Sequence, residues 1–76
     1  MGTINVLGRQ GDLTVSWNPT NTLQVEHARK TFNHNVQVNR FAAFKLDEGD
    51  LDTAERITEF DPLAQRIVMV PALGGG

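Results

Sequence analysis

The sequence has 76 residues, of which 39% are hydrophobic and 21% charged, and its formal net charge is −2. A chain of this length and composition forms one folded domain with one core rather than a disordered segment. The negative charge excludes a field suited to nucleic-acid phosphates or an anionic membrane, and the lack of cysteine excludes disulfides, thiolate metal sites and a thiol nucleophile.

The N-terminal residues predict a β-hairpin. Residues 3–7 and 12–17 each alternate apolar and polar side chains, which is the period of a half-buried strand. The residues between the two segments begin with Gly8 and end with Gly11, where a tight reversal of the chain most needs a positive φ. The side chains expected to face inward are those of Ile4, Val6, Leu13, Val15 and Trp17.

A helix is expected next. Residues 18–21 contain a proline and end the second strand, because proline lacks the N–H that a ladder needs. Asn21 or Thr22 then caps a helix from Leu23 to about Asn35, which frays over its last three residues because they are polar. The residues that recur at helical spacing on its apolar face are Val25, Ala28, Phe32 and Val36.

The second half of the chain returns to strand character. Residues 40–46 predict a strand, an acidic turn follows, and residues 55–60 contain a short strand. The Asp-Pro pair at 61–62 predicts a turn. Residues 66–70 predict the last strand, which Pro71 ends because it cannot donate to a neighbour.

These elements predict an α+β fold. The order ββαβ(β)β suits a mixed sheet of four to five strands packed on one helix. If the first and last strands lie side by side and parallel, the long crossover that contains the helix should be right-handed. We expect one domain over residues 1–71 and a flexible C-terminal tail over residues 72–76.

The order of elements, their lengths and the glycine-rich end resemble ubiquitin and small bacterial ubiquitin-like proteins, which share the β-grasp fold. In that family a leucine shortly precedes a terminal di-glycine, and here Leu73 and Gly75-Gly76 occupy those places. The tail of ubiquitin also carries arginines, which this tail lacks. The resemblance therefore implies a dedicated activating enzyme.

The resemblance also implies a function, that of a protein modifier. An ATP-dependent activating enzyme would adenylate the carboxylate of Gly76, which Gly75 precedes, and the product would be joined to a target amine through an isopeptide bond. Leu73 and Gly74 would contact the activating enzyme, since a chain without Cβ atoms can be drawn extended through a narrow channel. A conjugating enzyme and a deconjugating peptidase are further implied partners.

Two neighbouring strands are apolar on both faces. The residues expected to face the helix are Phe41, Ala43, Ile67 and Met69. The residues then expected to face outward, where ubiquitin has a partner-binding patch, are Ala42, Phe44, Val68 and Val70. The alternative is that both faces are covered or that the phase is shifted by one residue. The two lysines, Lys30 and Lys45, are the candidate linkage points for chains of the modifier.

The sequence gives little support for metal binding, catalysis or membrane insertion. His27 and His34 lie roughly 10 Å apart along one helix, too far to share a metal. The acidic residues 47–52 lack the spacing of an EF-hand, and no nucleophile and base stand in a catalytic pattern. No apolar run suits a membrane span, and residues 1–10 do not form a signal peptide. We therefore expect a cytoplasmic monomer that is not an enzyme and holds neither metal nor cofactor.

Two other functions share the same features. A sulfur carrier would convert the adenylated carboxylate of Gly76 into a thiocarboxylate, and a non-covalent binding module would act through the surface around Phe44. The first alternative needs the tail, whereas the second does not.

Overall fold

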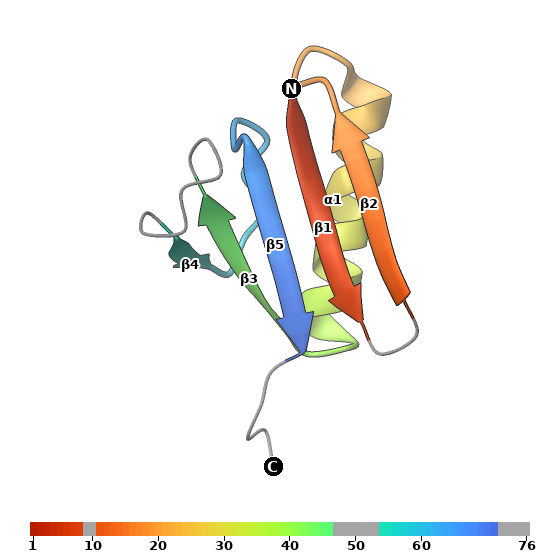
Figure 1. Ribbon diagram of the computed structural model, residues 1–76. Helices are drawn as coiled ribbons and strands as arrows, with labels where there is room; N and C mark the ends of the chain where they lie inside the picture. Colours follow the sequence, from red (N-terminus) through yellow and green to blue (C-terminus); the bar gives the residue numbers. More distant parts are fainter. Residues whose placement is uncertain (9–10, 47–53, 72–76) are drawn as a thin grey trace.

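The computed structural model describes residues 1–8, 11–46 and 54–71. Within these residues one helix packs on one face of a mixed sheet of five strands (Figure 1). The helix is α1 (Thr22–Gln37), and the strands are β1 (Gly2–Gly8), β2 (Gly11–Trp17), β3 (Phe41–Leu46), β4 (Glu55–Ile57) and β5 (Arg66–Pro71). The predicted α+β class and element order are confirmed.

The strand order in the sheet is β2-β1-β5-β3-β4. β1 and β2 form the predicted antiparallel hairpin, which closes with Gly8 paired to Gly11. β1 and β5 pair in parallel at the centre of the sheet, with Ile4 opposite Ile67. β3 runs antiparallel to both β5 and β4. The conformation of the hairpin turn at residues 9–10 lies outside the described residues.

The helix begins where its sequence indicates but ends later. The Asn21 side chain accepts a hydrogen bond from the backbone N–H of Gln24 at 3.1 Å, which is the geometry of an N-cap. The expected fraying at residues 33–35 is wrong, because Asn35 is 8% exposed and its amide donates to the carbonyl of Thr31 at 2.8 Å. Its carbonyl oxygen accepts from the Asn39 side chain at 3.0 Å. Asn35 therefore lies on the buried face of α1, and the helix continues past it.

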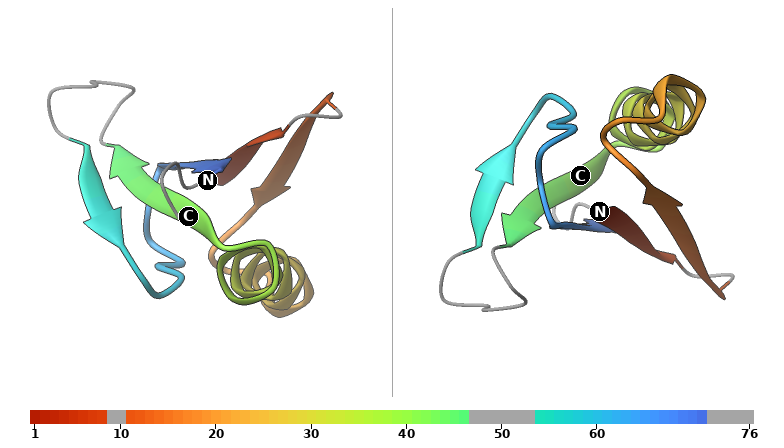
Figure 2. Two further views of the ribbon diagram at one scale, coloured as in Figure 1. Left: turned by 90° about the horizontal axis from the view of Figure 1, so that it is seen from below. Right: turned by 90° about the horizontal axis from the view of Figure 1, so that it is seen from above.

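The core lies between α1 and the sheet, and the segment between β4 and β5 covers the same face beside the helix (Figure 2). Trp17 and Phe32 are fully buried, and the ring of Phe60 contacts both, with centroids 5.0 Å and 6.0 Å away. The Trp17 indole N–H donates to the carbonyl of Pro62 at 2.9 Å, so the largest core side chain also ties this segment to β2.

The predicted inward faces are confirmed with one exception. The buried cluster includes the predicted residues Ile4, Val6, Val15, Trp17, Ala28, Phe32, Ala43, Ile67 and Met69. Val25, Val36 and Phe41 pack against this cluster while partly exposed. Leu13 is 51% exposed, which is a correction, because it lies near the hairpin end of β2, an edge strand that lacks a neighbour on one side.

The predicted Asp-Pro turn is also confirmed. The Asp61 side chain accepts from the backbone N–H of Leu63 at 2.9 Å, and its carbonyl accepts from Ala64 at 3.1 Å. Ala64 is thereby placed in the core. In the part of the chain that the structure describes, no helix has the length and apolar character needed to cross a membrane.

Candidate functional site

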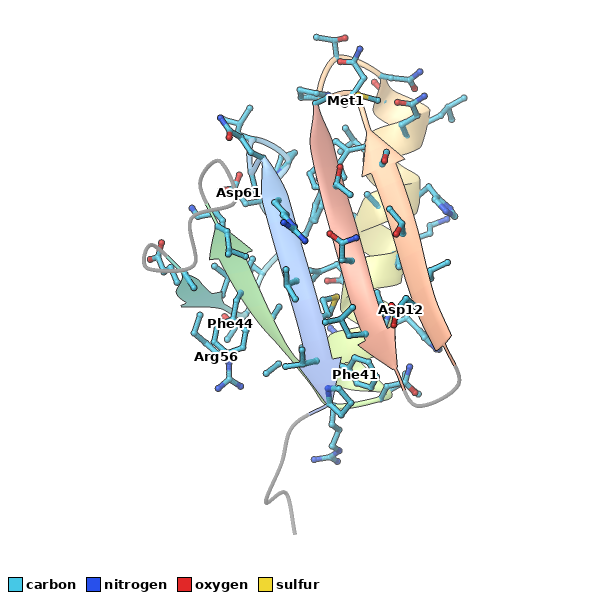
Figure 3. The ribbon with its side chains drawn as sticks, viewed as in Figure 1. Met1, Asp12, Phe41, Phe44, Arg56 and Asp61 are labelled. Carbon is cyan, nitrogen blue, oxygen red and sulfur yellow. The ribbon has the colours of Figure 1, made fainter. Side chains whose placement is uncertain are left out.

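The two apolar strands β3 and β5 pair so that the candidate recognition residues meet across them. Phe44 lies opposite Val68, and Ala42 lies opposite Val70. These four alternate along the strands with Phe41, Ala43, Ile67 and Met69, which belong to the core cluster or pack against it. The four therefore lie on the sheet face away from α1. Figure 3 views this face, with the helix behind the sheet.

Three of the four residues offer surface to a partner. Phe44, Val68 and Val70 are half-buried, and we refer to these three as the outer patch. Ala42 is 8% exposed, so the expectation that it contributes exposed surface is corrected. A methyl side chain does not reach beyond its larger neighbours on the pleat.

Polar residues that sequence reasoning missed border the outer patch. The Arg66 guanidinium donates to the Asn5 side chain at 3.1 Å, and the Asn5 amide donates to the Thr14 hydroxyl at 3.2 Å. These bonds join the outer faces of β5, β1 and β2. Arg56 lies opposite Phe44 in the β3–β4 pair and is exposed. The outward positions of Asn5 and Thr14 in the alternating pattern were the available signal for this network.

The predicted conjugation residues follow directly on β5. Pro71 is the last residue of that strand and lies opposite Phe41. Gly75 and Gly76, together with the predicted enzyme contacts at Leu73 and Gly74, lie outside the described residues. These assignments stay predictions.

The two candidate linkage lysines differ in their surroundings. Lys30 is exposed on α1. The Lys45 side chain is 28% exposed, and its ammonium lies 3.2 Å from a carboxylate oxygen of Asp61 and 3.9 Å from one of Glu55. The structure therefore distinguishes an accessible amine from one held in an ion pair.

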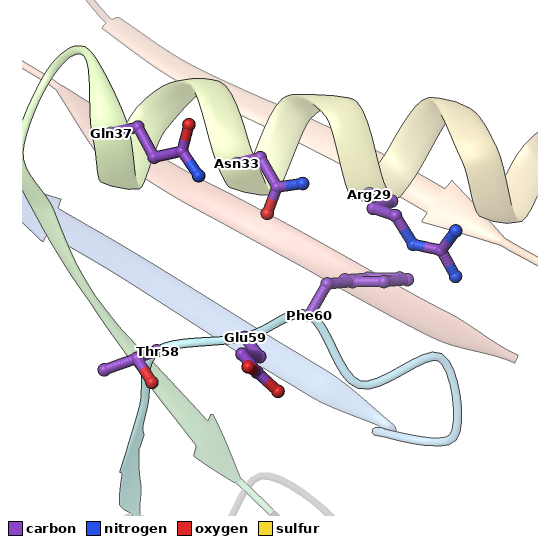
Figure 4. A pocket seen from close by; sticks show the side chains of 6 residues that line it. All are labelled: Arg29, Asn33, Gln37, Thr58, Glu59 and Phe60. Atoms are coloured by element: carbon purple, nitrogen blue, oxygen red, sulfur yellow. The ribbon is translucent and has the colours of Figure 1, made fainter.

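Sequence reasoning also missed a groove between α1 and the segment after β4 (Figure 4). It has a volume of about 500 Å³. Its lining residues are Arg29, Asn33 and Gln37 from the helix and Thr58, Glu59 and Phe60 from the segment. The helical spacing of the first three was visible in the sequence, but the segment that faces them was not.

Among the described residues, no group of three or more histidine and acidic side chains is arranged to hold a metal ion. His27 and His34 are both exposed. The acidic residues 47–52 lie outside the described part of the chain. Comparison of the chain with protein-family models, with curated proteins and with solved structures gives no match.

Proposed function

We propose that the chain is a monomeric ubiquitin-like protein of the β-grasp fold and that it acts as a protein modifier. One observation carries the proposal: β1 and β5 pair in parallel at the centre of the sheet, and β5 is followed after one residue by the sequence Leu-Gly-Gly-Gly. The coarse architecture supports the β-grasp fold, since a single helix crosses one face of a mixed sheet.

The tail would carry the chemistry. The Gly76 carboxylate attacks the α-phosphate of ATP and releases pyrophosphate, which leaves an acyl adenylate. A target amine that attacks the acyl carbon of the adenylate directly displaces AMP. Alternatively, an enzyme thiol displaces AMP to form a thioester, and the target amine then attacks the thioester carbonyl and displaces the thiol. The segment 72–76 spans at most about 17 Å when extended, which suffices to carry its end away from the sheet and into an enclosing site.

The folded body would be recognised through the outer patch. Phe44, Val68 and Val70 are the apolar centre of this surface, and Arg56 and Arg66 border it. A partner that presents apolar side chains with carboxylates around them matches this arrangement in shape and charge. The carboxyl group of Gly76 would attach the protein to its target, and partner proteins would then bind the outer patch of the attached protein.

The test is ATP–pyrophosphate exchange in the presence of an activating enzyme of the ubiquitin type from the organism that carries the chain. Exchange is expected with the intact protein and is expected to vanish when Gly75 and Gly76 are deleted. Ser16→Ala, an exposed change on β2, serves as the control and should leave exchange unchanged. Exchange that persists after the deletion, or that is absent with the intact protein, contradicts the proposal.

Intact mass separates the modifier from the sulfur carrier. A modifier yields adducts larger than the chain by the mass of a target. A sulfur carrier instead gains only the difference between one sulfur and one oxygen atom. A chain that yields neither product but still binds partners through Phe44 would be a non-covalent binding module.

Phe44→Ala tests the outer patch. The change removes a half-buried ring from the face opposite the core, so the fold should persist while partner binding weakens by roughly tenfold or more, as at an aromatic interface centre. Isothermal titration calorimetry with the activating enzyme measures the effect, and Ser16→Ala, an exposed change on β2, is the control. Equal affinities for Phe44→Ala and wild type would remove the outer patch from the proposed function.

A further inference from the structure

The groove between α1 and the segment after β4 has no part in the proposed function. Its helical wall lies on the side of the sheet that α1 covers, whereas the outer patch lies on the other side. Its volume of about 500 Å³ falls within the ~300–1,000 Å³ that ligand sites occupy. In Figure 4 the two walls run alongside one another, so the groove has the shape of a trough.

Three of the polar side chains that line the groove are available to a ligand. Within the described residues, no hydrogen bond or ion pair joins the side chains of Asn33, Gln37 or Glu59 to another residue. Likewise, none of the backbone hydrogen bonds found in the described turns and loops involves residues 58–60. A ligand would therefore gain hydrogen bonds here without breaking any within the protein.

The wall formed by residues 58–60 is also held in place. The ring of Phe60 packs edge-on against Trp17 at 5.0 Å and against Phe32 at 6.0 Å. Both of these partners are fully buried. The core thus fixes the position of this wall before a ligand arrives, which lowers the entropic cost of binding.

The spacing of the helical wall fits an extended peptide. Asn33 and Gln37 are one turn apart, a rise of about 6 Å along the helix axis. Every second peptide group of an extended chain recurs after about 6.7 Å. A carboxamide offers a carbonyl acceptor and an N–H donor, as a peptide group does, so the two side chains can bond to alternate peptide groups. The backbone of residues 58–60 can pair with the peptide's other edge, as in strand addition.

The charges of the groove favour a basic peptide. Arg29 lies at the helical wall, but its guanidinium is 2.6 Å from the carboxylate of Glu26, which balances its charge. Glu59 is exposed and has no such partner among the described residues. We propose that this groove binds an extended segment of a partner protein that carries a lysine or arginine opposite Glu59.

Two libraries of random octapeptides test this proposal. They are identical except that one has a fixed central lysine and the other a fixed central glutamate. Selection on the folded full chain is expected to enrich the lysine library alone. Enriched peptides should shift the backbone NMR signals of Asn33, Gln37 and residues 58–60.

Variants then assign the contacts. Glu59→Gln should lower the affinity for the enriched peptides by roughly twofold to fivefold, which is the contribution of one exposed charge pair. The double variant Asn33→Ala with Gln37→Ala should lower this affinity further. The helix should be preserved, because alanine is the best helix former. His27→Ala, an exposed helical change outside the groove, should have no effect. Circular dichroism checks that each variant is folded.

Four outcomes overturn the proposal. They are no enrichment from either library, equal enrichment from both, binding that the double alanine variant leaves unchanged, and NMR shifts that fall on the outer patch. Each of these results is independent of ATP and of residues 72–76. Failure here therefore leaves the proposed function untouched, and failure of pyrophosphate exchange leaves the groove untouched.

Discussion

Gly2 shows how one residue without a side chain shapes the core. It lies opposite Trp17 in the β1–β2 register, and both residues are buried. A Cβ added to Gly2 would overlap three atoms of the indole ring. That ring cannot move aside easily, because its N–H is bonded to the carbonyl of Pro62 and the ring of Phe60 packs against it. Glycine is required here by contact and not by backbone conformation.

We therefore expect Gly2→Ala to lower the free energy of unfolding by about 1–3 kcal/mol, the usual range for overpacking a core. Chemical denaturation followed by Trp17 fluorescence measures the change. Ser16→Ala, an exposed change in the strand opposite, should stay within about 0.5 kcal/mol of wild type. An unchanged midpoint for Gly2→Ala would mean that the indole does not lie against Gly2.

The close approach of Gly2 and Trp17 could not be read from the sequence. Alternation placed Trp17 on the inner face of its strand, and this was confirmed. It did not show which residue the ring would cover, because that depends on the register between the strands. The hydrogen bond to Pro62 was equally hidden, since it joins residues 45 positions apart in the chain.

At the scale of the elements, the connection from α1 to β3 contains one strained residue. Arg40 has a φ of 58°, and it is the only residue other than glycine with a positive φ among those described. The helix ends at Gln37, and its C-cap Val38, whose N–H is bonded to the carbonyl of His34 at 2.9 Å, lies two residues before Arg40. A left-handed backbone conformation is usually taken by glycine, since a Cβ is disfavoured there by about 1–2 kcal/mol.

Arg40→Gly is expected to raise the free energy of unfolding by up to about 1 kcal/mol. The relief of strain exceeds the entropy that glycine adds to the unfolded chain, which is about 0.5–1 kcal/mol. Urea denaturation measures the difference. Arg40→Ala keeps the Cβ and loses the guanidinium, so it should bring no gain. If both variants were equally stabilised, the charge and not the backbone would be responsible.

The helix and the strands were predicted well where the spacing of apolar residues along the sequence matches the buried positions. The period failed at the end of α1, where Asn35 is buried although it is polar. Its bonds to Thr31 and Asn39 satisfy the amide locally, and a pattern of apolar residues cannot detect such a bond. The groove was missed for a related reason, since its second wall has irregular backbone with no period.

At the scale of the whole molecule, the fold gives the two lysines different surroundings and so distinguishes them as candidate linkage points. The sequence offers Lys30 and Lys45 as equal candidates for linkage. In the fold, Lys45 lies on the same side of the sheet as the Asp61 turn, and its ammonium is held 3.2 Å from the Asp61 carboxylate. Lys30 is exposed on α1. Acylation needs an amine that can approach an electrophile, so the Lys45 amine must first leave its ion pair.

We expect limited acetylation of the folded protein by an N-hydroxysuccinimide ester to modify Lys30 at least twofold to fivefold faster than Lys45. The lower bound reflects the strength of one partly exposed ion pair, and the lower exposure of Lys45 adds to it. Peptide mass spectrometry gives both rates in one sample.

Asp61→Asn is the matched variant, because the amide oxygen can still accept from the N–H of Leu63 while the nearer of the two carboxylates described beside Lys45 loses its charge and Glu55 stays in place. It should speed acetylation of Lys45 and leave the rate at Lys30 unchanged. In conjugation reactions that form chains, the same difference predicts linkage through Lys30, so Lys30→Arg should remove most chains and Lys45→Arg few. A faster reaction at Lys45 in the wild-type protein would show that the ion pair does not restrain this amine in solution.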